Sequence, residues 1–336
     1  MPIDMNKLLS QFKKLSPDKQ KLFREKVNSS LPTRKVYTLD KLIQSKCDEG
    51  ILCPHCHSIE IVKNGTQTNK QRYKCKSCNK TFTILSDTFL AWTKKDFQVW
   101  KKFIYCMIEG FSVRKSATIC KINRNTAFVW RHKILDSLSI YMSNQNSMKG
   151  IVEADDTFFR LSFKGNKSLK TLPYKNTDNK RKRGLSKQQV CVSCAIARDK
   201  KTVYSKITTL GRAKVKDLQK VFKGHLSKKA ILCTDKDKAY YNFAKQIGLE
   251  HIQLQSGTAS KIGIYHIQNI NSYHSRLKFF IRRFKGVSTK YLNNYLTWNN
   301  IIQERKYNKI RLLKICIKVI NHVRWNMLND RPLIPI

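Results

Sequence analysis

The hydrophobic and polar positions divide the chain into regions of different periodicity. Residues 1–46, 94–143 and about 268–330 place apolar side chains at helical spacing, with basic residues between them. From Gly150 onward, short β-branched runs alternate with polar or helical segments, a pattern typical of an α/β domain. The runs that predict strands are 151–159, 190–197, 202–207 and 230–234.

The helical region 94–143 predicts three helices. The first would end near Gly110, Ser112 would cap the second, and Asn123 or Asn125 would open the third. Two short helices before a basic third helix are typical of a helix-turn-helix, although a purely structural three-helix domain has the same pattern. The third helix would present these DNA-binding side chains: Arg124, Asn125, Thr126 and Arg131.

Two CxxC pairs lie between the first two helical regions. "CPHC" contains Cys53 and Cys56, "CKSC" contains Cys75 and Cys78, and 18 residues separate the pairs. Each pair directs two thiolates toward one point, so two pairs complete a tetrahedron around Zn²⁺. This spacing predicts a structural zinc ribbon.

Further predictions concern the strands around these pairs and a third pair of cysteines. A hairpin is predicted between the pairs, with its turn near Asn64–Gly65 or Thr68–Asn69, and "KTFTILSDTF" predicts a further strand. Cys191 and Cys194 also have CxxC spacing, but strand positions three apart point to opposite faces. We therefore expect these two cysteines to be core residues.

The charge of the chain indicates its partner. The 336 residues include 67 Lys and Arg against 22 Asp and Glu, a formal net charge of +45, and the basic residues occur along the whole length. Such a chain repels itself unless a polyanion neutralises it, so we expect a nucleic-acid surface rather than a membrane-surface protein. No stretch approaches the roughly 20 apolar residues of a membrane span, and 11 cysteines fit metal binding in a reducing compartment. We expect a cytoplasmic location.

Carboxylates are scarce, yet two of them are adjacent inside the predicted strand "IVEADDTFF". Alternation favours Asp155, on the more polar face, as the member of a site, whereas Asp156 could cap the strand end or bind a lysine. Asp235 ends the apolar run 230–233, and the carboxyl ends of strands hold ligands in open α/β sheets. Asp237 could be a helix N-cap.

Two neighbouring buried carboxylates repel unless a cation lies between them. Mg²⁺ is such a cation and is usually shared with phosphates, so the acids suggest metal-assisted phosphoryl transfer on nucleic acid. A helix from about Ile270 would place Asn271 and Lys278 on one face, together with His274 and Ser275. Asn271 offers a metal one carbonyl oxygen and Lys278 can hold a phosphate, although a polar helix face is usually only solvated.

With these residues placed, the chain resembles bacterial insertion-sequence transposases of the ISXO2-like group. The matching stretches are "CPHC…YKCKSC", "VEADDTFF", "LCTDKDKAY" and "HIQNINSYHSRLKFFIRRFKGVSTKYLNNYLTW". The resemblance implies a multi-domain protein with a zinc ribbon, a helix-turn-helix and an α/β ribonuclease H-like core. It implies Asp155, Asp235 and Asn271 as ligands of Mg²⁺ or Mn²⁺, with Lys278 as their companion. Asn271 stands where most relatives have Glu, so we expect weaker metal affinity.

The resemblance also implies an activity. The protein would bind the terminal inverted repeats of an insertion sequence and catalyse cleavage and transfer of DNA strands, with two Mg²⁺ about 4 Å apart. Paired ends imply a homodimer or a higher oligomer on double-stranded DNA. The expected domains are a helical segment at 1–46, the ribbon at 47–92, the helix-turn-helix at 93–147 and the catalytic domain at 148–336. The alternatives are a regulator without catalysis, a DNA nuclease on the same core, and a structural zinc protein.

Overall fold

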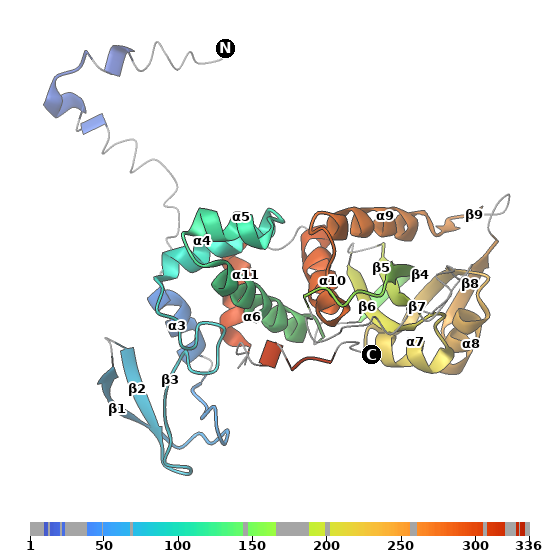
Figure 1. Ribbon diagram of the computed structural model, residues 1–336, viewed down its shortest axis with the longest axis horizontal. Helices are drawn as coiled ribbons and strands as arrows, with labels where there is room; N and C mark the ends of the chain where they lie inside the picture. The colour runs from blue at the N-terminus through green and yellow to red at the C-terminus, as the bar shows by residue number, and fades with distance from the viewer. Residues whose placement is uncertain are drawn as a thin grey trace. The chain divides into compact units, whose positions relative to one another are not determined.

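The computed structural model describes most of the chain (Figure 1). The described residues are 10–12, 14–20, 22–23, 39–48, 50–67, 70–143, 147–165, 188–198, 202–255, 261–304, 308–319, 327–328 and 330–332. The chain divides into two compact units, residues 1–42 and residues 43–336. In the first unit a short helical stretch begins at Pro17, where the amide of Gln20 donates to the carbonyl of Ser16. Residues 166–187, between the predicted strands 151–159 and 190–197, lie outside the described residues.

A three-stranded antiparallel ribbon opens the second unit, after helix α3. Gln67 at the end of β1 pairs with Lys70 at the start of β2, and the predicted turn at Thr68–Asn69 between them lies outside the described residues. The other predicted turn, Asn64–Gly65, lies at an irregularity inside the first strand. The bounds are α3 Leu39–Cys47, β1 Ile61–Gln67, β2 Lys70–Cys75 and β3 Thr81–Thr83.

Three helices follow the ribbon at the predicted places. The hydroxyl of Ser112 accepts from the amide of Lys115 and so caps the second helix, while the side chain of Asn123 accepts from the amide of Asn125 at the start of the third. Gly110 ends the first helix with a positive φ of 68°, which glycine adopts without strain. The bounds are α4 Phe97–Ile108, α5 Val113–Cys120 and α6 Arg124–Ser143.

The core of the second unit is a mixed five-stranded sheet with the order β6-β5-β4-β7-β8. β5 is antiparallel to both of its neighbours, whereas β7 is parallel to β4 and to β8. Three antiparallel strands, β4 to β6, beside two strands that run parallel to β4 give the ribonuclease H-like core that was expected. The bounds are β4 Met148–Arg160, β5 Gln189–Ala197, β6 Val203–Leu210, β7 Leu226–Asp235 and β8 Glu250–Leu254.

Helices cover both faces of this sheet. Strand residues alternate between faces, and two residues of β4 that are three positions apart reach different helices. The carboxylate of Asp156 accepts from the hydroxyl of Tyr240 on α8, whereas that of Glu153 accepts from amides at the start of α9. α7 and α8 therefore lie on one face and α9 on the other, as Figure 1 shows. The bounds are α7 Val215–Phe222, α8 Lys238–Ile247, β9 Lys261–Ile262, β10 Tyr265–His266 and α9 Gln268–Arg282.

Two further helices connect the sheet with the three-helix segment. α10 (Thr289–Glu304) contacts β6 and α6, and α11 (Lys309–Lys318) packs on α4 and α6. The indole of Trp298 donates to the carbonyl of Met107, and the amide of Asn294 bonds to the ring of His132. None of the helices among the described residues is both long and apolar enough to cross a bilayer.

Candidate metal and nucleic-acid sites

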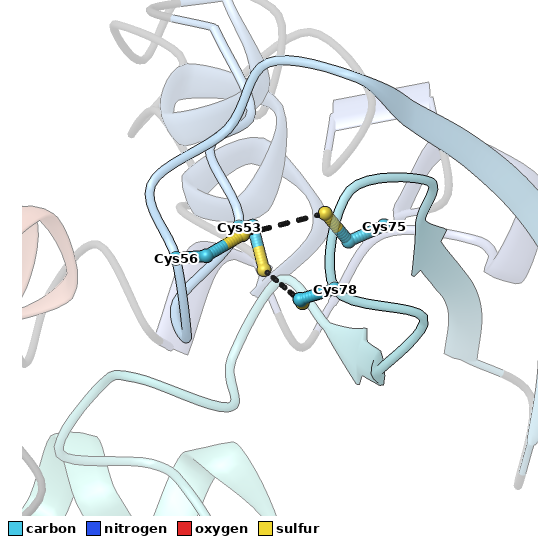
Figure 2. A group of neighbouring side chains, drawn as sticks. All are labelled: Cys53, Cys56, Cys75 and Cys78. Atoms are coloured by element: carbon cyan, nitrogen blue, oxygen red, sulfur yellow. Dashed lines mark hydrogen bonds between the residues drawn. The ribbon is translucent and has the colours of Figure 1, made fainter.

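The four ribbon cysteines converge on one point (Figure 2). Their sulfur atoms all lie within 4.8 Å of one another, with Cys53 and Cys78 3.6 Å apart and Cys56 and Cys75 3.5 Å apart. The backbone amide of Cys78 bonds to the sulfur of Cys75 and contributes most to lowering the pKa of that thiol to about 6. A pair of CxxC turns with closely spaced thiols, one of them readily ionised, is the donor set that Zn²⁺ takes in structural sites.

Asp155 and Asp235 lie on adjacent parallel strands. Glu153 of β4 pairs with Cys233 of β7, and the two aspartates follow two residues later on the same strands. Burial raises the pKa of Asp155 to about 7, and the negative charge of Asp235 adds to the shift. Burial also raises the pKa of Asp235, whose carboxylate accepts from the amide of Asp237.

The negative charge of Asp235 adds to the raised pKa of Asp155, an arrangement that a cation between the two carboxylates would relieve. Each carboxylate is partly removed from water, so its charged form is disfavoured until a positive partner arrives. Divalent cations of the Mg²⁺ type prefer oxygen ligands of this kind. Among the described Cys, His, Asp and Glu side chains, however, only the four cysteines form a group of three or more within 4.8 Å. The acidic pair therefore needs oxygen from other groups to surround a cation.

Asn271 and Lys278 lie on α9, the helix that covers the Asp155 face of the sheet. Both side chains are exposed. The positive charge of Lys278 acts on Cys194, the residue that pairs with Asp155 across β4 and β5. The same charge lowers the pKa of His274, whose ring approaches Asp155.

His274 lies on the same helix, one turn after Asn271. Its Nδ1 is 3.7 Å from a carboxylate oxygen of Asp155, and the side chain is buried. Burial, followed by the charge of Lys278, lowers the pKa of His274 to about 4, so the ring is neutral at pH 7. A neutral imidazole does not compete with a cation for Asp155.

Glu153 is a site residue that the sequence pattern did not reveal. Its carboxylate is completely buried and accepts from Nε of Arg198 at 2.6 Å. It also accepts from the amide of Asn269 at 2.9 Å, from the side chain of Asn269 at 2.6 Å, and from the amide of Ile270 at 3.1 Å. A negative charge at the first turn satisfies the unpaired helix amides and interacts favourably with the helix dipole. Glu153 thus fixes the start of α9, directly before Asn271.

The two alternative acids have structural roles. Asp156 points to the opposite face, where it accepts from the hydroxyl of Tyr240 at 2.7 Å and from the thiol of Cys191 at 3.3 Å. Asp237 caps α8 by accepting from the amide of Ala239 and pairs with Arg212 at 2.9 Å. Cys191 and its neighbour Cys194 are fully buried, which confirms that this CxxC belongs to the core.

Three of the four predicted DNA-binding residues lie together at the start of α6. Arg124 and Asn125 are exposed and Thr126 is half-buried. Arg131 is different, and its expected contact with DNA is corrected here. It is fully buried, its Nη2 donates to the carbonyl of Phe111, and its guanidinium lies 4.6 Å from the ring centre of Trp298.

Arg131 is buried because of its position on α6. It lies two turns beyond the exposed start of the helix, where its neighbours Trp130 and Ile134 are buried. A guanidinium can enter such a core when it stacks on aromatic faces and bonds a carbonyl. A side chain without exposed surface in this fold does not reach a base edge.

Comparison with known proteins finds matches to two protein families. Residues 147–298 match the family described as the ISXO2-like transposase domain, and residues 50–79 match the InsA N-terminal domain, a zinc ribbon. A relative in Halobacterium salinarum, described as an uncharacterized protein in transposable element ISH50, is 24% identical over 125 residues. That alignment covers 37% of this chain and 42% of the relative.

Two solved assemblies show only distant similarity. The simian T-cell lymphotropic virus intasome in complex with PP2A regulatory subunit B56 gamma has a TM-score of 0.26 and 13% identity, over 47% of this chain and 49% of the other. The pre-cleavage Mos1 transpososome has a TM-score of 0.21 and 8% identity, over 94% and 96%. Scores this low support no argument about this chain. The sequence matches thus give a region similar to the ISXO2-like transposase domain, which follows a region similar to the zinc ribbon of InsA.

Proposed function

We propose that the protein is a DNA transposase that binds the terminal inverted repeats of an insertion sequence and catalyses cleavage and transfer of DNA strands. The observation that carries the proposal is the pair formed by Asp155 and Asp235. They lie at neighbouring positions on adjacent strands, and the charge of one opposes ionisation of the other. In a chain of net charge +45, such a pair has a physical reason only if a cation and a polyanion meet there.

The proposed ligands of the catalytic cation are Asp155, Asp235 and Asn271. When bound, Mg²⁺ or Mn²⁺ would supply charge stabilisation at the reacting phosphate and activate the attacking hydroxyl group. Asn271 contributes a neutral oxygen, so the site carries one negative charge fewer than a site with three carboxylates. Lys278, exposed two turns later on the same helix, would hold a DNA phosphate.

DNA binding is assigned to the ribbon and to the start of α6, where Arg124, Asn125 and Thr126 form the proposed reading surface. Arg131 is left out because it is buried. We further propose the domain division 1–46, 47–92, 93–147 and 148–336. Because two element ends must be brought together, the active form would be a homodimer or a higher oligomer.

The test uses the full chain and DNA duplexes taken from the sequences that flank the gene on each side. With Mg²⁺, the protein should release a 3′-OH at one position and join it to a second, unlabelled duplex. Asp155→Asn and Asp235→Asn should abolish both steps while leaving duplex affinity within about twofold, because these residues touch the cation rather than the base edges. Glu250→Gln, an exposed acid on β8, is the matched control and should keep full activity.

The alternatives are separated by the same assay. Binding without cleavage in Mg²⁺ or Mn²⁺ would indicate a DNA-binding regulator. Cleavage without joining of the freed 3′ end would indicate a nuclease. Full cleavage by Asp155→Asn would refute the assignment of the site.

A further inference from the structure

A groove of about 440 Å³ lies between the ribbon and the segment that joins it to α4. Strands β2 and β3 form one wall and residues 85–93 contribute the other. The polar and aromatic side chains that line it include Lys70, Arg72, Thr81, Thr83, Ser86 and Trp92. Its composition resembles neither an apolar core cavity nor the acidic pair on the sheet.

The joining segment is held rigidly. The ring of Phe89 is fully buried and meets Trp100 edge-on, with 5.0 Å between the ring centres. The indole of Trp100 donates to the hydroxyl of Thr93 at 2.9 Å, and Nζ of Lys133 donates to the carbonyl of Ala91 at 3.1 Å. The residues on both sides of position 92 are therefore fixed to α4 and α6.

Between these anchors Trp92 projects into solvent. Its exposed fraction is 81%, and its backbone has a φ of 61°, in the left-handed region that non-glycine residues rarely adopt. Tryptophan is usually one of the most buried residues on average, and strained backbone persists only where the surroundings hold it. The fold thus maintains, at a cost in free energy, an indole beside the groove.

The charge of the groove indicates what the indole meets. Lys70 and Arg72 are two residues apart on β2, so both point to one face of the ribbon. No ion pair among the described residues involves either of them. A basic groove with an exposed aromatic face is how proteins hold single-stranded nucleic acid, because phosphates meet the cations and bases stack on the ring. Inside a duplex, the faces of the bases are already stacked on one another.

We propose that this groove binds an unpaired nucleotide of DNA, whose base stacks on Trp92 while its phosphate lies against Lys70 and Arg72. The inference rests on the proposed function only in taking DNA as the partner. It assigns the ribbon groove to unpaired DNA, as distinct from the duplex surface at the start of α6. It requires no catalysis, so it is measured on binding alone.

The test compares a blunt DNA duplex with the same duplex carrying a three-nucleotide 3′ overhang that contains 2-aminopurine, at one fixed salt concentration. The full chain should bind the overhang duplex more tightly and quench the 2-aminopurine fluorescence. Trp92→Ala should reduce that preference by about 5- to 150-fold, which is the 1–3 kcal/mol of one base–aromatic stack, and should abolish the quenching. Trp92→Phe should retain part of both, and Lys70→Gln should weaken binding with a smaller salt dependence.

The control is Ile59→Ala, which removes another exposed apolar side chain of the ribbon outside the groove, at 79% exposure, and should change nothing. The zinc content and circular dichroism of each variant verify that the ribbon is folded. An unchanged overhang preference in Trp92→Ala would overturn the proposal, and so would equal losses on blunt and overhang DNA. Absence of strand transfer together with the Trp92 dependence would reject the proposed catalysis and leave the groove assignment intact.

Discussion

The buried carboxylate of Glu153 gives a prediction that the structure makes quantitative. In Glu153→Gln, one oxygen remains to accept from the amides of Asn269 and Ile270. The other becomes an NH₂ group facing two donors, Nε of Arg198 and the side-chain amide of Asn269, both at 2.6 Å in the native protein. The donor groups of Arg198 and Asn269 would then face another donor, so they would lose these hydrogen bonds while remaining desolvated.

The magnitude follows from these two lost bonds. Hydrogen bonds to charged groups contribute roughly 1.5–3 kcal/mol each, and breaking a buried ion pair costs about 3–5 kcal/mol. Arg198 is 20% exposed and keeps bonds to the carbonyls of Ile264 and His266, which limits the loss. We therefore expect the free energy of unfolding of the core domain to fall by about 3–5 kcal/mol.

Urea unfolding, followed by circular dichroism, measures this change, and hydrogen exchange locates it. The first turn of α9 should exchange faster in Glu153→Gln, whereas the exposed Glu250→Gln should stay within about 0.5 kcal/mol of the native protein. A loss below about 1 kcal/mol with normal protection of α9 would refute the role given to Glu153.

Four further outcomes are expected. Removing zinc with a chelator, or replacing Cys75 by Ser, should unfold the ribbon, because structural zinc contributes about 10–16 kcal/mol in small domains; zinc content and circular dichroism measure it. Arg131→Met should lower stability without changing the salt dependence of DNA binding, whereas Arg124→Ala should reduce the salt slope by about one with unchanged stability. Burial, followed by the charge of Arg331, holds the pKa of His132 well below 6.5, so stability should fall as the pH drops below about 6.5, and His132→Phe should remove part of that fall in urea titrations at pH 7 and pH 5. Asn271→Asp should tighten Mn²⁺ binding in calorimetry because it adds a carboxylate, and unchanged affinity would count against Asn271 as a ligand.

Local signals in the sequence predicted much of this fold. The CxxC spacing located the ribbon. Ser112 marked one helix start, and of the two candidates for the next start, Asn123 and Asn125, the hydrogen bonds select Asn123. Alternation in β4 correctly separated Asp155 from Asp156. These features depend on residues close together in the chain, so periodicity and capping chemistry reveal them. The short strand β8 was not predicted, because its five residues are mostly half-buried and carry no clear alternation.

The contacts that position the site could not be predicted in this way. Glu153 bonds residues 116 and 117 positions away, and Arg131 enters a core built by α10. From the sequence alone, an Arg that follows exposed polar residues on a helix is interpreted as a surface residue. Only its packing against Trp298 in the structure shows that it is buried. Hydrophobic periodicity did not single out Trp92, because its exposed position depends on the hydrogen bonds that hold Ala91 and Thr93.

The most direct test of the central claim is anomalous diffraction from crystals of the full chain soaked in MnCl₂. The account predicts a Mn²⁺ peak about 2.1 Å from carboxylate oxygens of both Asp155 and Asp235, with the side-chain oxygen of Asn271 in reach, and its loss in Asp155→Asn. Peaks confined to other acids, or no peak near this pair at saturating Mn²⁺, would contradict it.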